Sequence, residues 1–253
     1  SLGAAQAVYS FVTSLTQEID WAAIQLSLNL AAEARVAAFL DGGHYIVNDT
    51  VQVPSNTIWQ GPGRVKAAAG LAAPVIRLAD RDRVLIAIAE VDGNKANCPS
   101  GAEGIALNGD NNSNITIEGV YVHDCKTHGV YFRGDVLATN VAAVNCRSED
   151  NGAGGITCAQ LIRHGRFIGN HVEGNGTHGL GILGVAEHCA IVGNTAEANG
   201  PDSDNFTGYN AANHDIIVAN NVSRGGLNHG IHFGGGRVVY VGNTSIGTVV
   251  GNG

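Results

Sequence analysis

A repeat of about 25 residues in the second half of the chain restricts the fold more than any other feature of the sequence. The same place in successive repeats holds a glycine or, once, an asparagine: Gly104, Gly129, Gly155, Gly179, Asn205 and Gly230. A second column keeps nearly the same step: Asn145, Asn170, Asn194, Asn220 and Asn243. Two independent columns with one step indicate a solenoid, in which each repeat is one coil stacked on the next.

The pattern inside each repeat predicts short strands. After the column glycine, apolar residues alternate with others: Ile105 and Leu107, Val130 and Phe132, Ile156 and Cys158, Leu180 and Ile182, and Ile231 and Phe233. A period of two places these residues on one side of a strand, facing the core. The repeat is too short for a propeller blade, and it lacks both a helical pattern and a leucine-rich signature. We therefore expect an all-β, single-stranded right-handed parallel β-helix, with the asparagine column forming a side-chain ladder at a turn.

The N-terminal part of the chain differs from the repeats. Residues 1–40 are expected to form a helical cap and residues 41–253 the β-helix, which stops inside what looks like a further coil. Ile24, Leu28 and Ala31 follow helical spacing, and Asp20 is a suitable N-cap. A helix here would cover the open end of the first coil.

Composition excludes several classes of partner. The net charge is −8 with only 14 Lys and Arg, which argues against nucleic acid. Neither a signal peptide nor a membrane span is visible. The sequence has no nucleotide-binding loop and no zinc-spaced His/Cys set, so we expect the protein to require neither a nucleotide nor zinc. The five cysteines form no CxxC pair and are expected to be buried, reduced thiols: Cys98, Cys125, Cys146, Cys158 and Cys189.

Three sets of residues should share one outward face of the coils, at one position before the column glycine and at two and four positions after it. The first set is Glu103, His128, Gly154, His178, Asp204 and His229. The second is Ala106, Tyr131, Thr157, Gly181, Thr207 and His232, and the third is Asn108, Arg133, Ala159, Leu183, Tyr209 and Gly234. The candidate catalytic residues are His128, Tyr131, Arg133, His178 and Asp204, and the candidate substrate-binding residues are Glu103, Tyr209, His229 and His232. The alternative is that these are ordinary solvated strand residues.

The functional hypothesis is acid/base chemistry on a sugar chain. Removal of the C5 proton of a uronate needs a base, a group that neutralises the carboxylate and an acid for the leaving oxygen. Arg133 would neutralise the carboxylate, His128 or His178 would be the base, and Tyr131 or Tyr209 the acid. The reaction would be β-elimination or, if the proton returns on the other face, epimerisation.

Two other classes remain open. A glycosidase needs two carboxylates about 5 to 9.5 Å apart, and Glu103 and Asp204 lie four coils apart, so hydrolysis ranks second. Asp202 and Asp204 in one turn could pair or bind a cation, which leaves calcium open. The third class is a non-catalytic glycan-binding module, in which Gly154, Gly181 and Ala159 would leave a shallow groove for an oligosaccharide.

The chain also resembles a known group. Residues 20–66, which end in GGHYIVNDTVQVPSNTIWQGPGRVK, resemble the opening of the pectate-lyase-like β-helix superfamily, which includes many phage tailspikes and extracellular polysaccharide-modifying enzymes. The stretch NITIEGVYVHDCKTHGVYFRG and the later NHDIIVANNVSRGG are similar in layout to the catalytic module of mannuronan C5-epimerases. Those enzymes carry Tyr-Gly-Phe-Asp-Pro-His where this chain has residues 128–133, so His128 replaces the Tyr, Tyr131 the Asp and Arg133 the His.

The resemblance implies the β-helix fold and a polysaccharide partner that contains uronic acid. It also implies a location outside the cell or on a virion or cell surface, and a monomer or homotrimer. No membrane partner is expected. No cofactor is implied other than, at most, calcium.

Overall fold

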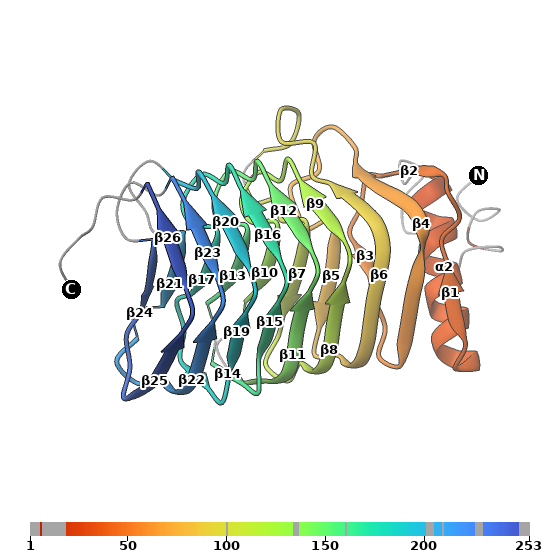
Figure 1. The fold of residues 1–253 in the computed structure, drawn as a ribbon. Helices are drawn as coiled ribbons and strands as arrows, with labels where there is room; N and C mark the ends of the chain where they lie inside the picture. Colours follow the sequence, from red (N-terminus) through yellow and green to blue (C-terminus); the bar gives the residue numbers. More distant parts are fainter. Residues whose placement is uncertain are drawn as a thin grey trace.

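The computed structural model describes residues 6, 19–99, 101–133, 137–159, 161–200, 205–208, 210–225 and 230–247. These residues form one helix, α2 (Ile19–Ala34), followed by a stack of short strands that all pair in parallel. Each turn of the chain adds one coil, and the coils progress from α2 at one end to β24, β25 and β26 at the other (Figure 1). The predicted parallel β-helix is confirmed.

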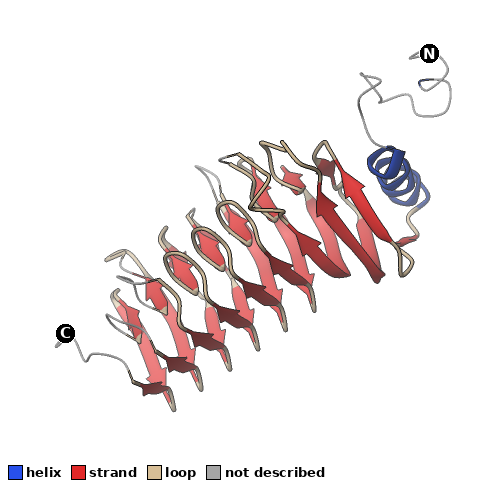
Figure 2. Ribbon diagram, turned by 90° about the horizontal axis from the view of Figure 1, so that it is seen from above, coloured by secondary structure: helices blue, strands red, loops and turns tan. Residues whose placement is uncertain are grey.

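The strands belong to two sheets (Figure 2). The small sheet has eight strands: β3 (Val51–Gln52), β5 (Ile76–Ala79), β7 (Ile105–Asn108), β10 (Val130–Phe132), β13 (Ile156–Cys158), β17 (Leu180–Ile182), β21 (Phe206–Gly208) and β24 (Ile231–Phe233). The large sheet has eighteen: β1 (Ala37–Phe39), β2 (His44–Val47), β4 (Thr57–Ala67), β6 (Asp82–Asp92), β8 (Ser113–Glu118), β9 (Tyr121–His123), β11 (Ala138–Val144), β12 (Arg147–Glu149), β14 (Ile162–Arg163), β15 (Arg166–Ile168), β16 (His171–Glu173), β18 (Ala186–Glu187), β19 (Ala190–Val192), β20 (Thr195–Glu197), β22 (His214–Ala219), β23 (Val222–Arg224), β25 (Arg237–Val241) and β26 (Thr244–Ile246).

The core lies inside the coils and confirms the predicted alternation. Of the ten apolar strand residues named above, nine are buried, and Ile231 on the last described coil is partly buried. The five cysteines are free and buried, as predicted. Burial raises the pKa of the Cys146 and Cys189 thiols to about 11, so both stay protonated at neutral pH.

Helix α2 covers the first coil in the expected way. Ile24, Leu28 and Ala31 are buried against it. The side-chain amide of Gln25 pairs with both backbone groups of Gln52: Gln52 N–H donates to Oε1 and Nε2 donates to Gln52 O, both at 2.7 Å. The helix thereby occupies the hydrogen bonds that an exposed edge strand would offer to another chain.

The N-cap prediction for Asp20 is wrong. Asp20 is the second residue of α2, and its Oδ2 accepts the Ile46 N–H at 2.9 Å instead. The carboxylate therefore joins the helix to β2 of the large sheet, although it still sits near the positive end of the helix dipole. The predicted division at residue 40 stays a prediction; β1, which precedes it, already pairs with β4.

The asparagine ladder exists, but its register differs from the predicted column at two coils. Asn170, Asn194, Asn221 and Asn243 pass side-chain hydrogen bonds of 2.9 Å from coil to coil. Asn145 and Asn220 stand one residue earlier, in the left-handed backbone conformation with φ of 52° and 55°. The ladder position and the turn position one residue before it look like a single column in the sequence, because asparagine suits both. The ladder uses its side-chain amide, and the turn uses its tolerance of positive φ.

A second ladder, at the corner beside the small sheet, was not predicted. It consists of Asn151, Asn175, Asn199 and Asn205, all buried. It explains the glycine column, because a Cβ at Gly155 would lie 2.7 Å from Asn175 Nδ2. Asn205 interrupts the glycine column since its own amide enters the ladder, accepting from Asn199 Nδ2 at 3.0 Å.

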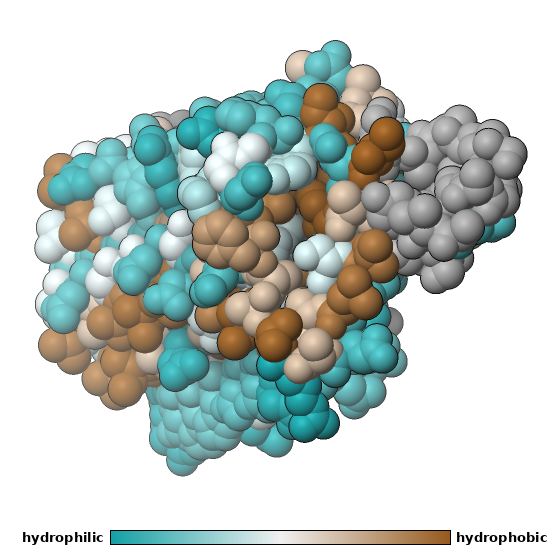
Figure 3. Space-filling view, turned by 90° about the vertical axis from the view of Figure 1, so that its right-hand side faces the viewer, coloured by the Kyte–Doolittle hydropathy of each residue, from teal (hydrophilic) through white to brown (hydrophobic). Residues whose placement is uncertain are grey.

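The N-terminal end of the molecule carries apolar surface patches (Figure 3). The exposed large apolar residues of α2 and the strands near it are Ile19, Leu30, Val36, Phe39, Ile46 and Ile58. Among the described residues, no helix is long and apolar enough to cross a membrane.

Candidate active site

The described residues of the three predicted columns lie on the strands of the small sheet and in the turns beside them. The second column is in strict register, with Tyr131 opposite Ala106 on one side and Thr157 on the other. The first column is held by backbone bonds: Gly104 N–H donates to His128 O, and Gly155 N–H donates to His178 O, both at 3.0 Å. Side chains from β10, β13 and the turns before them therefore meet on one surface.

Two histidines on this face are joined by one threonine. Thr157 Oγ1 lies 3.0 Å from His128 Nδ1 and 2.8 Å from His178 Nε2. Thr157 is fully buried and His178 is 7% exposed, so water does not compete for these bonds. At the far end, Thr177 Oγ1 lies 3.2 Å from His178 Nδ1. The four side chains form one continuous hydrogen-bonded chain.

The backbone sets the direction of this chain. Gly154 N–H donates to His128 Nδ1 at 3.0 Å, so that nitrogen is an acceptor and the neutral ring carries its proton on Nε2. The Thr157 hydroxyl donates to the same Nδ1 lone pair, which it shares with Gly154 N–H in a three-centre hydrogen bond, and it accepts from His178 Nε2–H. Burial lowers the pKa of His128 to about 4, helped by the charge of Arg133, and burial together with His128 lowers that of His178 to about 4. Both rings are neutral at pH 7, and His128 Nε2–H makes no hydrogen bond with the residues that the structure describes.

Two glycines make room for the His178 ring. A Cβ at Gly154 would lie 2.5 Å from His178 Nε2, and one at Gly181 would lie 2.4 Å from the same atom. The His178 imidazole fills the space over Gly154 and Gly181 in the predicted shallow groove, whereas the part of the groove at Ala159 stays a prediction. The glycines serve to seat a histidine on the sheet rather than to admit a ligand.

Tyr131, Arg133 and Glu103 surround His128. The Tyr131 ring stacks on the His128 ring, with centroids 4.2 Å apart and planes 25° apart. The Arg133 side chain is 62% exposed, and its Nη1 lies 3.9 Å from Glu103 Oε1. Glu103 is nearly buried, and that burial raises the pKa of its carboxyl, an effect that Arg133 partly opposes. A neutral donor, a phenol, a guanidinium and a carboxyl of raised pKa thus occupy adjacent coils.

Sequence reasoning overlooked one residue of this cluster, Thr157, and one further residue of the second column, Arg77. Thr157 was placed on the correct column but not selected, since an isolated threonine carries no chemical signal. Arg77 lies opposite Ala106 in the same column, one coil before the first repeat, and its Nε is buried without a hydrogen bond among the described residues. The alternation of β5 could have revealed Arg77 if the columns had been extended backwards.

The remaining candidates lie elsewhere or outside the described residues. His232 continues the second column on β24, beyond Gly181 and Thr207, and so belongs to a different stretch of the face. Asp204, Tyr209 and His229 lie outside the described residues. The predicted grouping of His178, Asp204 and His229 therefore stays a prediction, as does a calcium site at Asp202 and Asp204.

Three groups of histidine and carboxylate side chains lie at the large sheet, each with ligand atoms close enough to hold a metal ion. They are Asp92, His123 and Asp124; Glu149, His171 and Glu173; and His188, His214 and Asp215. In the part of the chain with described coordinates, the cluster around His128 contributes to none of them.

Comparison with known proteins supports the fold. No family model matches the sequence, and neither does any curated protein. Among solved structures, the A-module of a mannuronan C-5 epimerase from Azotobacter vinelandii superposes with a TM-score of 0.71 at 18% identity, covering 89% of this chain and 73% of that module. A pectate lyase gives a TM-score of 0.65 at 15% identity, with 89% of this chain and 65% of the enzyme covered.

A tailspike protein of an Escherichia coli O157:H7 bacteriophage gives a TM-score of 0.50 at 18% identity, with 90% of this chain matched to 36% of the tailspike. The chain thus spans most of the epimerase module but about a third of the tailspike. At these identities the likeness concerns the fold: this chain shares a parallel β-helix with the epimerase module and the pectate lyase.

Proposed function

We propose that the outer face of the small sheet binds a polysaccharide that contains uronic acid and removes the C5 proton of one sugar, leading to β-elimination or C5-epimerisation. The observation that carries this proposal is the neutral chain from His178 through Thr157 to His128, which ends beside Tyr131 and Arg133. The fold gives independent support, since a mannuronan C-5 epimerase module and a pectate lyase share it.

The tautomer of His128 changes the roles expected from the sequence. With Nδ1 occupied by Gly154 N–H, His128 offers Nε2–H and cannot accept a proton there. It acts with Arg133 as a donor to the sugar carboxylate, where negative charge grows as the C5 proton leaves. Donors fixed in advance at such a position stabilise the transition state without reorganisation. Both ring nitrogens of His178 are already bonded to threonine hydroxyls, those of Thr157 and Thr177, so His178 acts by positioning His128.

Glu103 and Tyr131 then remain as the proton-transferring groups. The raised pKa of Glu103 makes it a stronger base, once ionised, than an ordinary carboxylate. Tyr131 supplies a hydroxyl that can protonate the leaving oxygen or return a proton to C5. Hydrolysis is less well supported, because Glu103 is the one carboxylate in the described part of the three columns.

The test uses the purified chain with alginate, pectate, hyaluronan and capsular polysaccharides in deuterated water. Proton NMR reports unsaturated ends and deuterium at C5 together, and a reducing-end assay reports hydrolysis. We expect an unsaturated or C5-deuterated product, and a loss of rate of about 10²- to 10³-fold for Arg133→Gln. The matched control is Arg83→Gln, an exposed arginine on the large sheet, which should leave the rate unchanged.

The outcomes separate the three classes. New reducing ends without unsaturation would identify a hydrolase and contradict the assigned roles. Glycan binding without any product, weakened by Arg133→Gln, would leave a binding face and remove the catalytic proposal. Equal rates for the two arginine variants would place the chemistry elsewhere on the molecule.

A further inference from the structure

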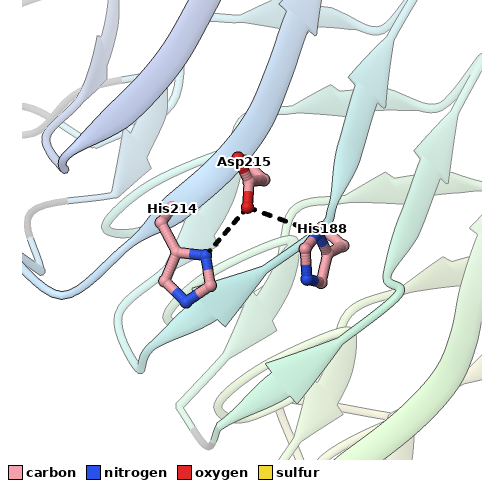
Figure 4. Close-up of side chains that lie close together, drawn as sticks. All are labelled: His188, His214 and Asp215. Carbon is pink, nitrogen blue, oxygen red and sulfur yellow. Dashed lines mark hydrogen bonds and ion pairs between the residues drawn. The ribbon is translucent and has the colours of Figure 1, made fainter.

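The group His188, His214 and Asp215 lies at the large sheet, away from the face described above. His188 follows β18, and His214 and Asp215 begin β22 on the next coil. His188 and Asp215 both have left-handed backbone conformations, with φ of 53° and 58°, and His188 N–H donates to His214 O at 3.2 Å. Residues 26 and 27 positions apart in the sequence are thereby neighbours (Figure 4).

Both imidazoles direct the same nitrogen at one carboxylate oxygen. His214 Nδ1 lies 3.2 Å and His188 Nδ1 lies 3.4 Å from Asp215 Oδ2. Zinc bound to nitrogen and oxygen at about 2.0–2.1 Å would place tetrahedral ligand atoms about 3.3–3.4 Å apart. The separations of 3.2 and 3.4 Å are close to that edge, and all three ligand atoms lie within 4.8 Å of one another.

The two histidines have neighbours of the kind that orient metal-binding imidazoles. Glu187 Oε1 lies 3.3 Å from His214 Nε2, so the second nitrogen faces a carboxylate and Nδ1 is left to bind a cation. Glu187 is itself held by Arg163 Nη2 at 2.6 Å. Arg237 Nη2 lies 2.6 Å from Asp215 Oδ2, the same oxygen that faces the two imidazoles, so a bound cation would share this oxygen with the guanidinium or displace it. The His164 ring stacks on the His188 ring with centroids 5.2 Å apart. The two imidazoles are therefore each oriented by a neighbour that is not itself a ligand.

We infer that His188, His214 and Asp215 form a binding site for a divalent transition-metal ion of the zinc type, which links two consecutive coils. Two imidazole nitrogens and one carboxylate oxygen favour such an ion over calcium or magnesium, which prefer oxygen ligands alone. Three protein ligands leave one position of a tetrahedron for water. His188 also lines a surface groove together with Asn114, Asn140, His164 and Arg166, so the site is open to solvent on that side.

Binding should be tested by isothermal titration of the metal-free chain with Zn²⁺ at neutral pH, and by the visible spectrum of bound Co²⁺. We expect saturable binding with a tetrahedral cobalt spectrum. His188→Ala and His214→Ala should weaken binding at least 100-fold, and Glu187→Gln, which alters only an orienting partner, should weaken it about 10- to 100-fold. All of these side chains are on the surface, and circular dichroism verifies that the variants fold.

Two control variants locate the ion. His44→Ala removes an exposed histidine of the large sheet, and His171→Ala removes the central ligand of a second candidate group; both should bind Zn²⁺ like the wild type. No saturable binding to the wild type would refute the inference, as would full binding by His188→Ala and His214→Ala. Loss of binding in His171→Ala alone would assign the ion to the other group and refute it equally.

Discussion

Replacement of Thr157 by valine tests the hydrogen-bonded chain at its centre. Valine keeps the shape of threonine and removes only the hydroxyl that joins His128 to His178. In Thr157→Val, His128 Nδ1 keeps its hydrogen bond from Gly154 N–H. His178 Nε2–H loses its acceptor, and water cannot easily replace it because His178 is only 7% exposed. A buried polar group without a partner costs about 1–3 kcal/mol, so we expect the free energy of unfolding to fall by that amount.

The chain contains a matched control for this substitution. Thr207 occupies the same column, is 4% exposed, and its Oγ1 makes no hydrogen bond with the described residues. Thr207→Val makes the same chemical change without breaking such a bond, so it should be neutral or slightly stabilising. The same urea-unfolding measurement serves both variants.

Nitrogen-15 NMR of the imidazole rings gives a second readout. In the wild type and in Thr157→Val, His128 should carry its proton on Nε2, because Gly154 still bonds to Nδ1, whereas the His178 signals should shift. Equal stability losses in Thr157→Val and Thr207→Val would refute the reasoning. So would a His128 proton on Nδ1 in the wild type.

Two further predictions concern acid stability and the asparagine ladder. His128 and His178 have pKa values of about 4 in the folded chain, against 6.5 for an ordinary histidine. Between these pH values the unfolded chain binds protons on the two rings that the folded chain does not bind. As the pH falls through this window, each ring should therefore lower the free energy of unfolding by up to about 3 kcal/mol. Urea unfolding at pH 7 and 4.5 measures this loss, which should be smaller in His178→Gln; an identical loss in the variant would contradict it. Asn194→Ala should cost about 2–5 kcal/mol, because the Asn170 N–H and the Phe167 carbonyl lose buried partners. The exposed Asn111→Ala is its control in the same assay, and comparable losses in the two variants would count against the ladder as a source of stability.

Much of the fold could be predicted because a solenoid repeats its constraints. The alternation after each column glycine names the core residues of five coils, and burial of a strand face requires that pattern in any parallel β-helix. The outward columns of the small sheet followed from the same register. The errors at Asn145, Asn220 and Asp20 share a cause: asparagine and aspartate suit several adjacent positions at turns and helix ends, and the sequence does not distinguish them.

The candidate site could be predicted in its location but not in its chemistry. Column spacing alone places four of its side chains on one surface, those of Glu103, His128, Tyr131 and Arg133. It could not show that Gly154 donates to His128 Nδ1, and that single backbone bond moves the proposed base from the histidines to Glu103. A hydrogen-bond direction depends on the local path of the chain, which composition and spacing do not encode.

The sequence by itself determined the solenoid, its step, its core and the face on which polar groups gather, because each follows from periodicity along one strand. Only the tertiary structure decided which side chains meet between coils. Thr157 joins two histidines from the coils on either side, and His188 and Asp215 meet across a distance of 27 residues without a short metal-binding motif. Stacking at the spacing of parallel strands makes neighbours of residues one whole coil apart, and their contacts depend on the side-chain directions at each corner.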